Sequence, residues 1–193
     1  VPPGLAYVAV SEKAWNVIEA CTTPRFYFDY PTYRKKMTGD SAQTPYTPAV
    51  SLMVAQNAAI ELIRQEGLEN VFERHRWLGK ACKAGVQALG IELFGPDDPE
   101  ANSVTACKVP PGVDGGKITK VARDKYGVWL AGGQGKLKGQ IFRFGHCGYF
   151  GASDILVGLG VLEMVLSELG YDVTWGAGTG AAARILAQSP VQL

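Results

Sequence analysis

The first residue of this sequence that could do chemistry is an arginine inside an apolar segment. Arg143 stands between Phe142 and Phe144, after a loop with four glycines, which are Gly132, Gly133, Gly135 and Gly139. Alternation along a strand predicts that Arg143 faces away from Phe142, Phe144 and His146. A guanidinium in such a segment must bind an anion or reach solvent, and its planar fork suits a carboxylate or a phosphate. It is therefore a structural salt-bridge residue, an arginine on an edge strand, or an anchor for a substrate carboxylate.

A second group of candidates lies on a polar loop at residues 38–48. Pro45 and Pro48 favour an extended backbone for the residues that precede them. The loop carries four side chains that can donate hydrogen bonds to a phosphate, which are Gln43, Thr44, Tyr46 and Thr47. The alternative is a rigid connector, in which Thr47 caps a helix that begins near Ala49.

Other polar residues are interpreted as structural. His75 falls on the apolar stripe of a predicted helix, where a single histidine is more often a core or boundary residue than a ligand. Asp97 and Asp98 lie between prolines on a predicted surface loop and are interpreted as solvated. The four cysteines are too far apart for a zinc site or a disulfide framework, which favours reduced thiols in a cytoplasm; they are Cys21, Cys82, Cys107 and Cys147.

The composition is that of an ordinary soluble globular protein. Of 193 residues, 47% are hydrophobic and 19% are charged, and the net charge is +1. These values give no reason to expect binding to nucleic acid or to an anionic membrane. The apolar stretch 156–169 is too short and too polar to span a membrane, and no signal peptide is recognisable. Because the sequence begins without methionine, we expect it to start within a longer protein.

Apolar periodicity predicts the elements that must position these side chains. Residues 5–10 are predicted to form a buried strand, and Ser11 to cap a helix that ends near Ala20. Further helices are predicted at 49–65, 68–89 and 117–126 and from Ser153 or Asp154 to Leu169, and strands at 91–94, 103–109, 128–131 and 141–146. Residues 174–180 are predicted to be flexible and to precede a short helix at 181–187.

The order of the later elements indicates an α/β (α+β) domain in which helices cover one face of a mainly antiparallel sheet. The first fifty residues do not fit this arrangement and look like the end of a different domain. We therefore expect three parts: the end of one domain at 1–52, bridging helices at 53–89 and a C-terminal small domain at 90–193.

Three separated segments, at residues 2–14, 43–52 and 132–146, agree with one family when they are taken together. With them, the sequence resembles the class V (fold-type I) pyridoxal-phosphate aminotransferases, most closely their alanine–glyoxylate and serine–glyoxylate group. The pair Arg74–His75 after Gly67 fits the same pattern, and the resemblance reaches from Pro2 to about Tyr171. Some members of this group are named soluble hydrogenase small subunits, although no cysteine pair in this sequence is spaced for nickel or iron–sulfur ligation.

The resemblance implies a role for each matching residue. Residues 1–52 would end the large cofactor-binding domain. Arg143 matches the arginine that binds the substrate α-carboxylate. Thr47 matches a threonine that reaches the phosphate of pyridoxal 5'-phosphate in the neighbouring subunit of a homodimer. Thr44 occupies the position of a family tyrosine and Tyr46 adjoins Thr47, so the resemblance leaves open which hydroxyl contacts the phosphate.

The resemblance also implies that the lysine that binds the cofactor precedes Val1. We therefore expect the C-terminal part of a cytoplasmic aminotransferase that moves an amino group from alanine or serine to a 2-oxo acid such as glyoxylate. The chain by itself is expected to be inactive, with no catalytic residue and no metal. Two alternatives are a non-catalytic α/β module for binding or dimerisation and a phosphate-binding domain built on residues 132–139, although no helix is predicted to start at that loop.

Overall fold

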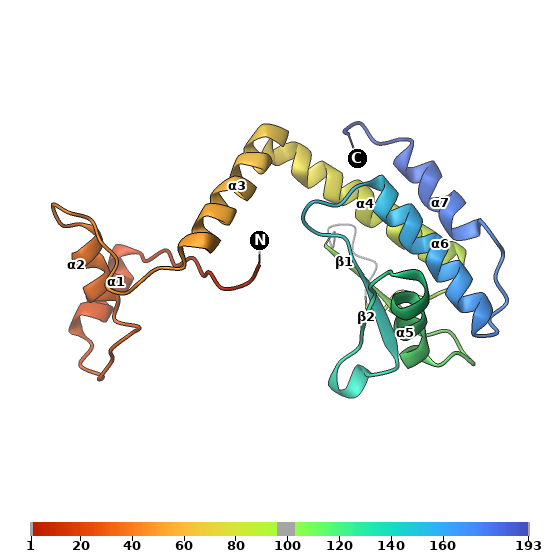
Figure 1. Ribbon diagram of the computed structural model, residues 1–193, viewed down its shortest axis with the longest axis horizontal. Helices are drawn as coiled ribbons and strands as arrows, with labels where there is room; N and C mark the ends of the chain where they lie inside the picture. Colours follow the sequence, from red (N-terminus) through yellow and green to blue (C-terminus); the bar gives the residue numbers. More distant parts are fainter. Residues whose placement is uncertain (1, 96–102, 193) are drawn as a thin grey trace. The chain divides into compact units, whose positions relative to one another are not determined.

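The computed structural model describes residues 2–95 and 103–192, so Asp97 and Asp98 lie outside the described residues. The chain divides into two compact units, Val1–Gln65 and Glu66–Leu193 (Figure 1). The boundary between these units falls within residues 53–89, the segment that the sequence predicts to bridge two domains.

The first unit contains helices α1 (Glu12–Ala20) and α2 (Tyr30–Met37) and most of α3 (Val50–Glu66). The Ser11 hydroxyl accepts a hydrogen bond from the Ala14 N–H at 3.3 Å, which confirms the predicted N-cap of α1. Arg34 of α2 lies over the Trp15 ring of α1 at 4.6 Å and pairs with Glu19 at 3.3 Å. No residue of α1, α2 or α3 is buried, so surface contacts rather than a core hold these two short helices together.

Residues 5–10 do not form the predicted strand. Their backbone is irregular, and the side chains of Tyr7 and Val8 are exposed. A strand needs a neighbour that pairs its N–H and C=O groups, and the described residues of this unit include no other strand. The prediction of a buried strand at residues 5–10 is therefore wrong both in its pairing and in its burial.

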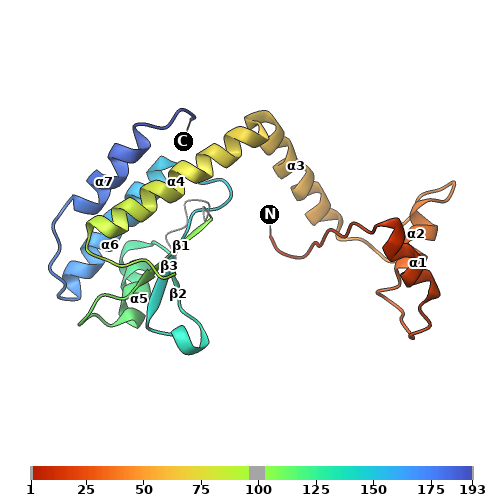
Figure 2. The same cartoon turned by 180° about the vertical axis from the view of Figure 1, so that it is seen from behind.

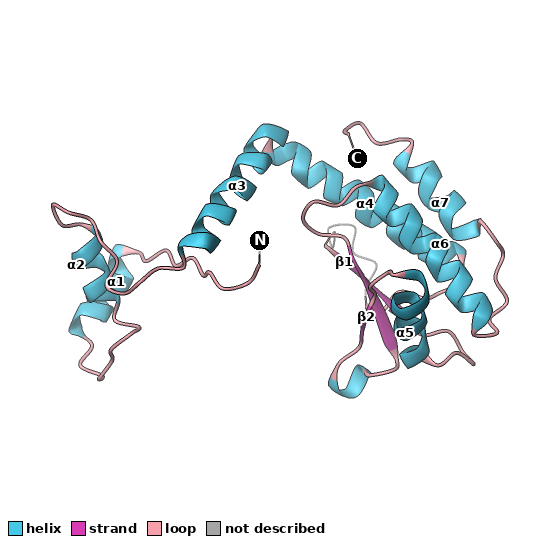
Figure 3. Cartoon of the chain, viewed as in Figure 1, coloured by secondary structure: helices cyan, strands magenta, loops and turns pink. Residues whose placement is uncertain are grey.

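The second unit contains a three-stranded antiparallel sheet in the order β1–β3–β2 (Figure 3). The strands are β1 (Val104–Lys108), β2 (Ala131–Gly132) and β3 (Ile141–Gly145), so the predicted strands at 103–109 and 141–146 are confirmed, each to within one residue at its ends. The predicted strand at 91–94 is only a bridge between Leu93 and Cys107, because Gly95, with φ +91°, turns the chain away. The predicted strand at 128–131 is reduced to β2, since only Ala131 and Gly132 reach β3.

Helices cover one face of this sheet, as the sequence predicts (Figures 1 and 2). They are α4 (Leu68–Ala88), α5 (Gly115–Tyr126) and α6 (Ala152–Glu168), and α7 (Ala177–Leu186) packs against α4 and α6. Thr105, Cys107, Phe142 and Phe144 are buried on the covered face. They meet a core to which four helices contribute, through Leu78 and Cys82 of α4, Ile118 of α5, Leu159 and Leu162 of α6, and Ala182 and Leu186 of α7.

The helix ends match the sequence signals in part. Gly127 ends α5 with φ +69°, as predicted. The N-cap of α6 is Gly151 rather than Ser153 or Asp154, and Asp154 instead accepts a hydrogen bond from the Gly151 N–H at 2.8 Å. Helix α7 begins at Ala177 rather than Ala181, in a segment that was predicted to be flexible. The reason is that buried Glu163 of α6 accepts hydrogen bonds from the N–H groups of Gly176 and Thr179, at 2.8 and 3.1 Å.

Candidate functional site

Arg143 lies on the central strand of the sheet, on the face opposite to Phe142 and Phe144. Ala106 of β1 and Ala131 of β2 are its partners in the ladder. The side chain is half-buried, and its Nη2 donates a hydrogen bond to the Gly132 carbonyl at 2.9 Å.

The guanidinium of Arg143 is otherwise unpaired. Its Nε is shielded from solvent and has no hydrogen-bond partner, and no carboxylate of the described residues forms an ion pair with it. A guanidinium has five N–H donors, and the Gly132 carbonyl engages only one of its nitrogens. The described part of the chain thus provides no structural salt bridge for Arg143 and leaves most of its donors for an anion.

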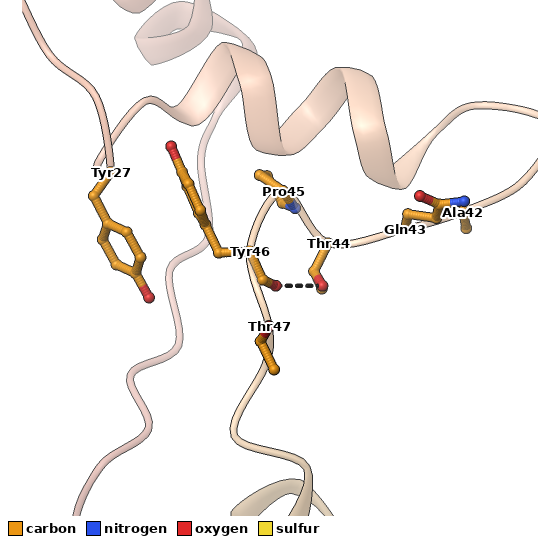
Figure 4. A pocket seen from close by; sticks show the side chains of 7 residues that line it. All are labelled: Tyr27, Ala42, Gln43, Thr44, Pro45, Tyr46 and Thr47. Atoms are coloured by element: carbon orange, nitrogen blue, oxygen red, sulfur yellow. Dashed lines mark hydrogen bonds between the residues drawn. The ribbon is translucent and has the colours of Figure 1, made fainter.

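The second candidate site is an open pocket of about 900 Å³ in the first unit (Figure 4). It is lined by Tyr27, Ala42, Gln43, Thr44, Pro45, Tyr46 and Thr47. The Gln43 N–H donates to the Lys36 carbonyl at 3.0 Å, which ties the loop to α2. The Tyr46 ring stacks on the Tyr27 ring with their centroids 4.7 Å apart. The structure therefore brings the three predicted hydroxyl groups together, in a different unit from Arg143.

The three hydroxyl groups differ in what they still can bind. Thr44 donates its hydrogen to the Tyr46 carbonyl at 2.7 Å, and Tyr46 donates its own to the Phe26 carbonyl at 3.0 Å. Figure 4 shows the first of these bonds as a dashed line. The exposed Thr47 hydroxyl makes no hydrogen bond with any described residue, and so does not cap α3. Because a hydroxyl has one hydrogen to donate, only Thr47 keeps it for a ligand.

The glycine-rich segment between β2 and β3 is a tight loop that contains the 3-10 turn η1 (Gly135–Leu137). Its N–H groups bond within the loop and to β3: Gly133 to the Ile141 carbonyl, Lys138 to Gly135 and Gln140 to Leu137, each at 3.0 to 3.2 Å. A Cβ at Gly133 would collide with the Leu137 carbonyl oxygen. The loop contains only this three-residue turn, so it does not provide the N-terminus of a helix for a phosphate. It places the Gly132 carbonyl against Arg143.

Arg74 makes a set of buried contacts that the sequence did not predict. Arg74 of α4 binds both carboxylate oxygens of Glu66, at 2.6 and 3.0 Å, and donates to the carbonyls of Gly148 and Phe150, at 3.0 and 2.8 Å. The hydrogen bond from Arg74 lowers the pKa of Glu66. The sequence signal was weak, because a glutamate and an arginine on either side of Gly67 do not predict a contact with residues 148–150.

His75 is a satisfied boundary residue, as predicted. Its Nε2 accepts a hydrogen bond from the Gly148 N–H at 3.2 Å, so Nδ1 carries the hydrogen that is donated to the Val71 carbonyl at 2.8 Å. His146, which shares the face of Phe142 and Phe144, is buried with its Nε2 2.8 Å from the Thr105 hydroxyl.

The cysteines give no reactive centre in the core. Burial raises the pKa of Cys82 to about 12 and also raises the pKa of Cys107, so both thiols stay protonated. Among the described residues, no group of three or more His, Cys, Asp or Glu side chains could hold a metal ion. Within the same residues, no helix is both long enough and apolar enough to cross a membrane.

No protein-family model matches the chain. It is 45% identical over 189 residues to a soluble hydrogenase small subunit from a Synechococcus strain, and 36% identical over 189 residues to serine–glyoxylate aminotransferase from Arabidopsis thaliana. Each match covers 96% of this chain, but 48% and 46% of the relative. The crystal structure of ureidoglycine–glyoxylate aminotransferase from Bacillus subtilis is similar with a TM-score of 0.82 and 30% identity, over 92% of this chain and 46% of that chain.

The chain belongs to the class V aminotransferases, as their C-terminal part. It spans about half the length of the curated relatives it matches. The class V aminotransferases use pyridoxal 5'-phosphate, and the chemistry of the Thr47 pocket fits the phosphate end of that cofactor, because a free hydroxyl donor stands in a polar, open pocket. Arg143 fits a carboxylate, because its planar guanidinium has donors that no described residue accepts.

Proposed function

We propose that this chain is the C-terminal part of a pyridoxal-phosphate aminotransferase that moves an amino group from alanine or serine to a 2-oxo acid such as glyoxylate. The observation that carries the proposal is the half-buried Arg143, whose guanidinium has no carboxylate partner in the described residues. The names of two relatives, a serine–glyoxylate and a ureidoglycine–glyoxylate aminotransferase, support glyoxylate as the acceptor.

Arg143 holds the α-carboxylate of the amino acid in this proposal. Two parallel hydrogen bonds from a guanidinium fix a carboxylate in both position and orientation. The bound substrate then presents its Cα–H bond in one direction, which lowers the entropic part of the barrier. Electron withdrawal from that bond is the chemistry that the bound cofactor supplies. The carbonyl of Gly132 keeps the guanidinium from turning away while the substrate exchanges.

Thr47 donates a hydrogen bond to the cofactor phosphate, across the interface of a cytoplasmic homodimer. Thr44 and Tyr46 do not, because each hydroxyl already donates to a backbone carbonyl. Their role is to shape the loop that presents Thr47. The open form of the pocket supports this assignment, since the pocket lacks the enclosing walls that a second subunit would supply. Neither nucleic acid nor a membrane is part of this proposal.

The intact protein supplies the rest of the machinery in a preceding segment, including the lysine that binds the cofactor. In that protein, residues 1–52 end the large domain, 53–89 form the bridging helices and 90–193 the small domain. The chain alone is accordingly inactive, because covalent catalysis needs the missing amine.

Transamination assays on two polypeptides test the proposal. We expect the intact protein to convert glyoxylate with alanine or serine as donor, and the 193-residue chain with added pyridoxal phosphate to show no turnover. Arg143→Lys in the intact protein should raise the KM of the amino acid strongly, because an ammonium cannot form the paired hydrogen bonds of a guanidinium. An unchanged KM would remove Arg143 from this role, and turnover by the isolated chain would show that no outside lysine is needed.

A non-catalytic module is the alternative. It predicts that the natural polypeptide has the mass of 193 residues and binds no amino acid at Arg143. A mass near twice that value, together with transaminase activity, would eliminate it.

A further inference from the structure

Residues 146–151, which join β3 to α6, are held by two side chains of α4. We call this segment the 146–151 loop. Arg74 donates through Nη1 to the carbonyls of Gly148 and Phe150, and His75 accepts the Gly148 N–H at Nε2. Three backbone groups on either side of Tyr149 are thereby fixed, although Tyr149 itself is 92% exposed. An exposed loop is not usually anchored by a buried arginine, because ordering the arginine side chain and removing its charge from water both cost free energy.

The two anchoring side chains are themselves oriented from behind. Glu66 binds Nε and Nη2 of Arg74, so that only Nη1 points to the loop. The Val71 carbonyl takes the Nδ1–H of His75, which leaves Nε2 as an acceptor for the Gly148 N–H. Arg74 is 8% exposed, so these hydrogen bonds form where water competes little. The contacts of Arg74 and His75 therefore favour one backbone conformation of the 146–151 loop.

The loop continues directly from the strand that carries Arg143. Beyond Gly145, the chain is still tied to β1, because the His146 N–H donates to the Ser103 carbonyl at 3.0 Å and its ring meets the Thr105 hydroxyl. Strand β2 pairs with β3 at Phe142 and Arg143, so among the described residues the C-terminal end of β3 has a paired strand on one side alone. A loop fixed at Gly148 and Phe150 supplies the missing restraint at that end.

We propose that Arg74 and His75 are positioning residues of the substrate site, which fix the 146–151 loop and through it the guanidinium of Arg143. The inference rests on the proposed role of Arg143 in binding a substrate carboxylate. Neither residue touches the substrate. Both act by narrowing the range of positions that the end of β3, and with it the Arg143 side chain, can occupy.

Nuclear magnetic resonance on the 193-residue chain tests the inference without any activity. The two probes are the amide of Gly148, which reports the loop, and the Nε–H of Arg143, which is shielded and unpartnered. In Arg74→Met and His75→Leu we expect Gly148 amide exchange to accelerate at least about tenfold, and the Nε–H signal of Arg143 to shift or broaden. An unchanged Gly148 amide would show that the contacts do not order the loop. A faster Gly148 amide with an unchanged Arg143 signal would show that the order does not reach Arg143.

Glu163→Gln is the matched control. It weakens another buried charged contact of the same unit, at the start of α7, and Glu163 makes no hydrogen bond to residues 146–151. It should lower stability but leave both probes unchanged. A shift of the Arg143 signal in this variant as well would mean that general loosening, rather than the loop, moves Arg143. His75→Gln, which offers an amide oxygen and an N–H in place of the two ring nitrogens, should restore part of the Gly148 protection lost in His75→Leu.

Kinetics on the intact protein separate positioning from stability. Arg74→Met should raise the amino-acid KM about tenfold with kcat within about twofold, whereas a purely structural role would lower the active fraction and leave KM unchanged. In an Arg143→Ala background, the same Arg74→Met change should no longer affect KM, because the residue through which it acts is gone. A persisting tenfold effect would overturn the inference. If the wild-type protein shows no transamination at all, the proposed function fails, while the two resonance probes still decide whether Arg74 and His75 order Arg143.

Discussion

Arg74 and Arg143 lie in the same unit and have opposite surroundings. Arg74 uses every guanidinium nitrogen, on the two oxygens of Glu66 and on two loop carbonyls. Arg143 is bonded at one carbonyl, and its buried Nε has no partner. Folding stabilises a buried charge by pairing it, so a charge that the fold leaves unpaired indicates that its partner comes from outside. The hydrogen bonds therefore distinguish an arginine whose donors the fold uses fully from one whose donors remain for a ligand.

The largest expected effect is the loss of kcat/KM on replacing Arg143, the arginine without a carboxylate partner among the described residues. Arg143→Ala in the intact protein should lower kcat/KM for the amino acid about 100- to 1,000-fold, which corresponds to about 3 to 4 kcal/mol of lost carboxylate binding. The free energy of unfolding of the 193-residue chain should change little, because the side chain makes one internal hydrogen bond. Steady-state kinetics and urea denaturation measure the two quantities. A large loss of stability would show that Arg143 is structural after all.

The paired arginine, Arg74, should differ from Arg143 chiefly in its effect on stability. Arg74→Met should destabilise the second unit by about 3 kcal/mol, because it leaves the Glu66 charge and two carbonyls without their donor. Urea denaturation followed by circular dichroism measures the change. Arg123→Met offers a control. Arg123 contacts its neighbour Asp124 and the exposed Trp129 ring, so we expect a loss of less than about 1 kcal/mol. If both variants lost the same unfolding free energy, the contacts of Arg74 would contribute no more to stability than those of an exposed arginine.

Local signals in the sequence predicted much of the second unit. The strand with Arg143, the glycine end of α5 and the sharing of one face by Phe142, Phe144 and His146 all follow from short-range patterns. The predicted strand at 5–10 failed because pairing depends on partners that a local pattern cannot reveal. The early start of α7 was missed for a similar reason, since Glu163 lies more than ten residues before the N–H groups that it binds.

The candidate site, like the fold, could be predicted from the sequence only in part. The sequence and its family resemblance proposed Arg143 and the loop with Thr44, Tyr46 and Thr47, but not which donors were still free. That distinction depends on contacts such as the bond from Tyr46 to Phe26, twenty residues away, which has no sequence signature. The hold of Arg74 on residues 148–150 is beyond sequence reasoning for the same reason, because it joins positions more than seventy residues apart.

The hydroxyls of Thr44, Tyr46 and Thr47 differ as the two arginines do, because only that of Thr47 has no hydrogen-bond partner among the described residues. Thr47→Val in the intact protein should weaken binding of pyridoxal phosphate about tenfold, because one hydrogen bond to a charged phosphate is lost. Thr44→Val should change it less than about threefold, since the Thr44 hydroxyl donates within the loop. Fluorescence titration of the apoenzyme measures both. A larger effect at Thr44 than at Thr47 would mean that the loop rearranges when the phosphate binds.

The smallest expected effect is a pH dependence that belongs to the paired arginine alone. The hydrogen bond from Arg74 lowers the pKa of Glu66 in the folded chain. The stabilisation is therefore complete above the ordinary glutamate pKa and is lost as the pH falls through the lowered one. Glu66→Gln should remove this part of the acid sensitivity, so the difference in unfolding free energy between wild type and variant should shrink between pH 6 and about pH 3. Arg143 has no carboxylate partner among the described residues, so Arg143→Met should leave the pH dependence of the 193-residue chain unchanged. If Arg143→Met flattened the pH dependence as Glu66→Gln does, Arg143 would have a carboxylate partner within the chain, and its guanidinium would not be free for a substrate.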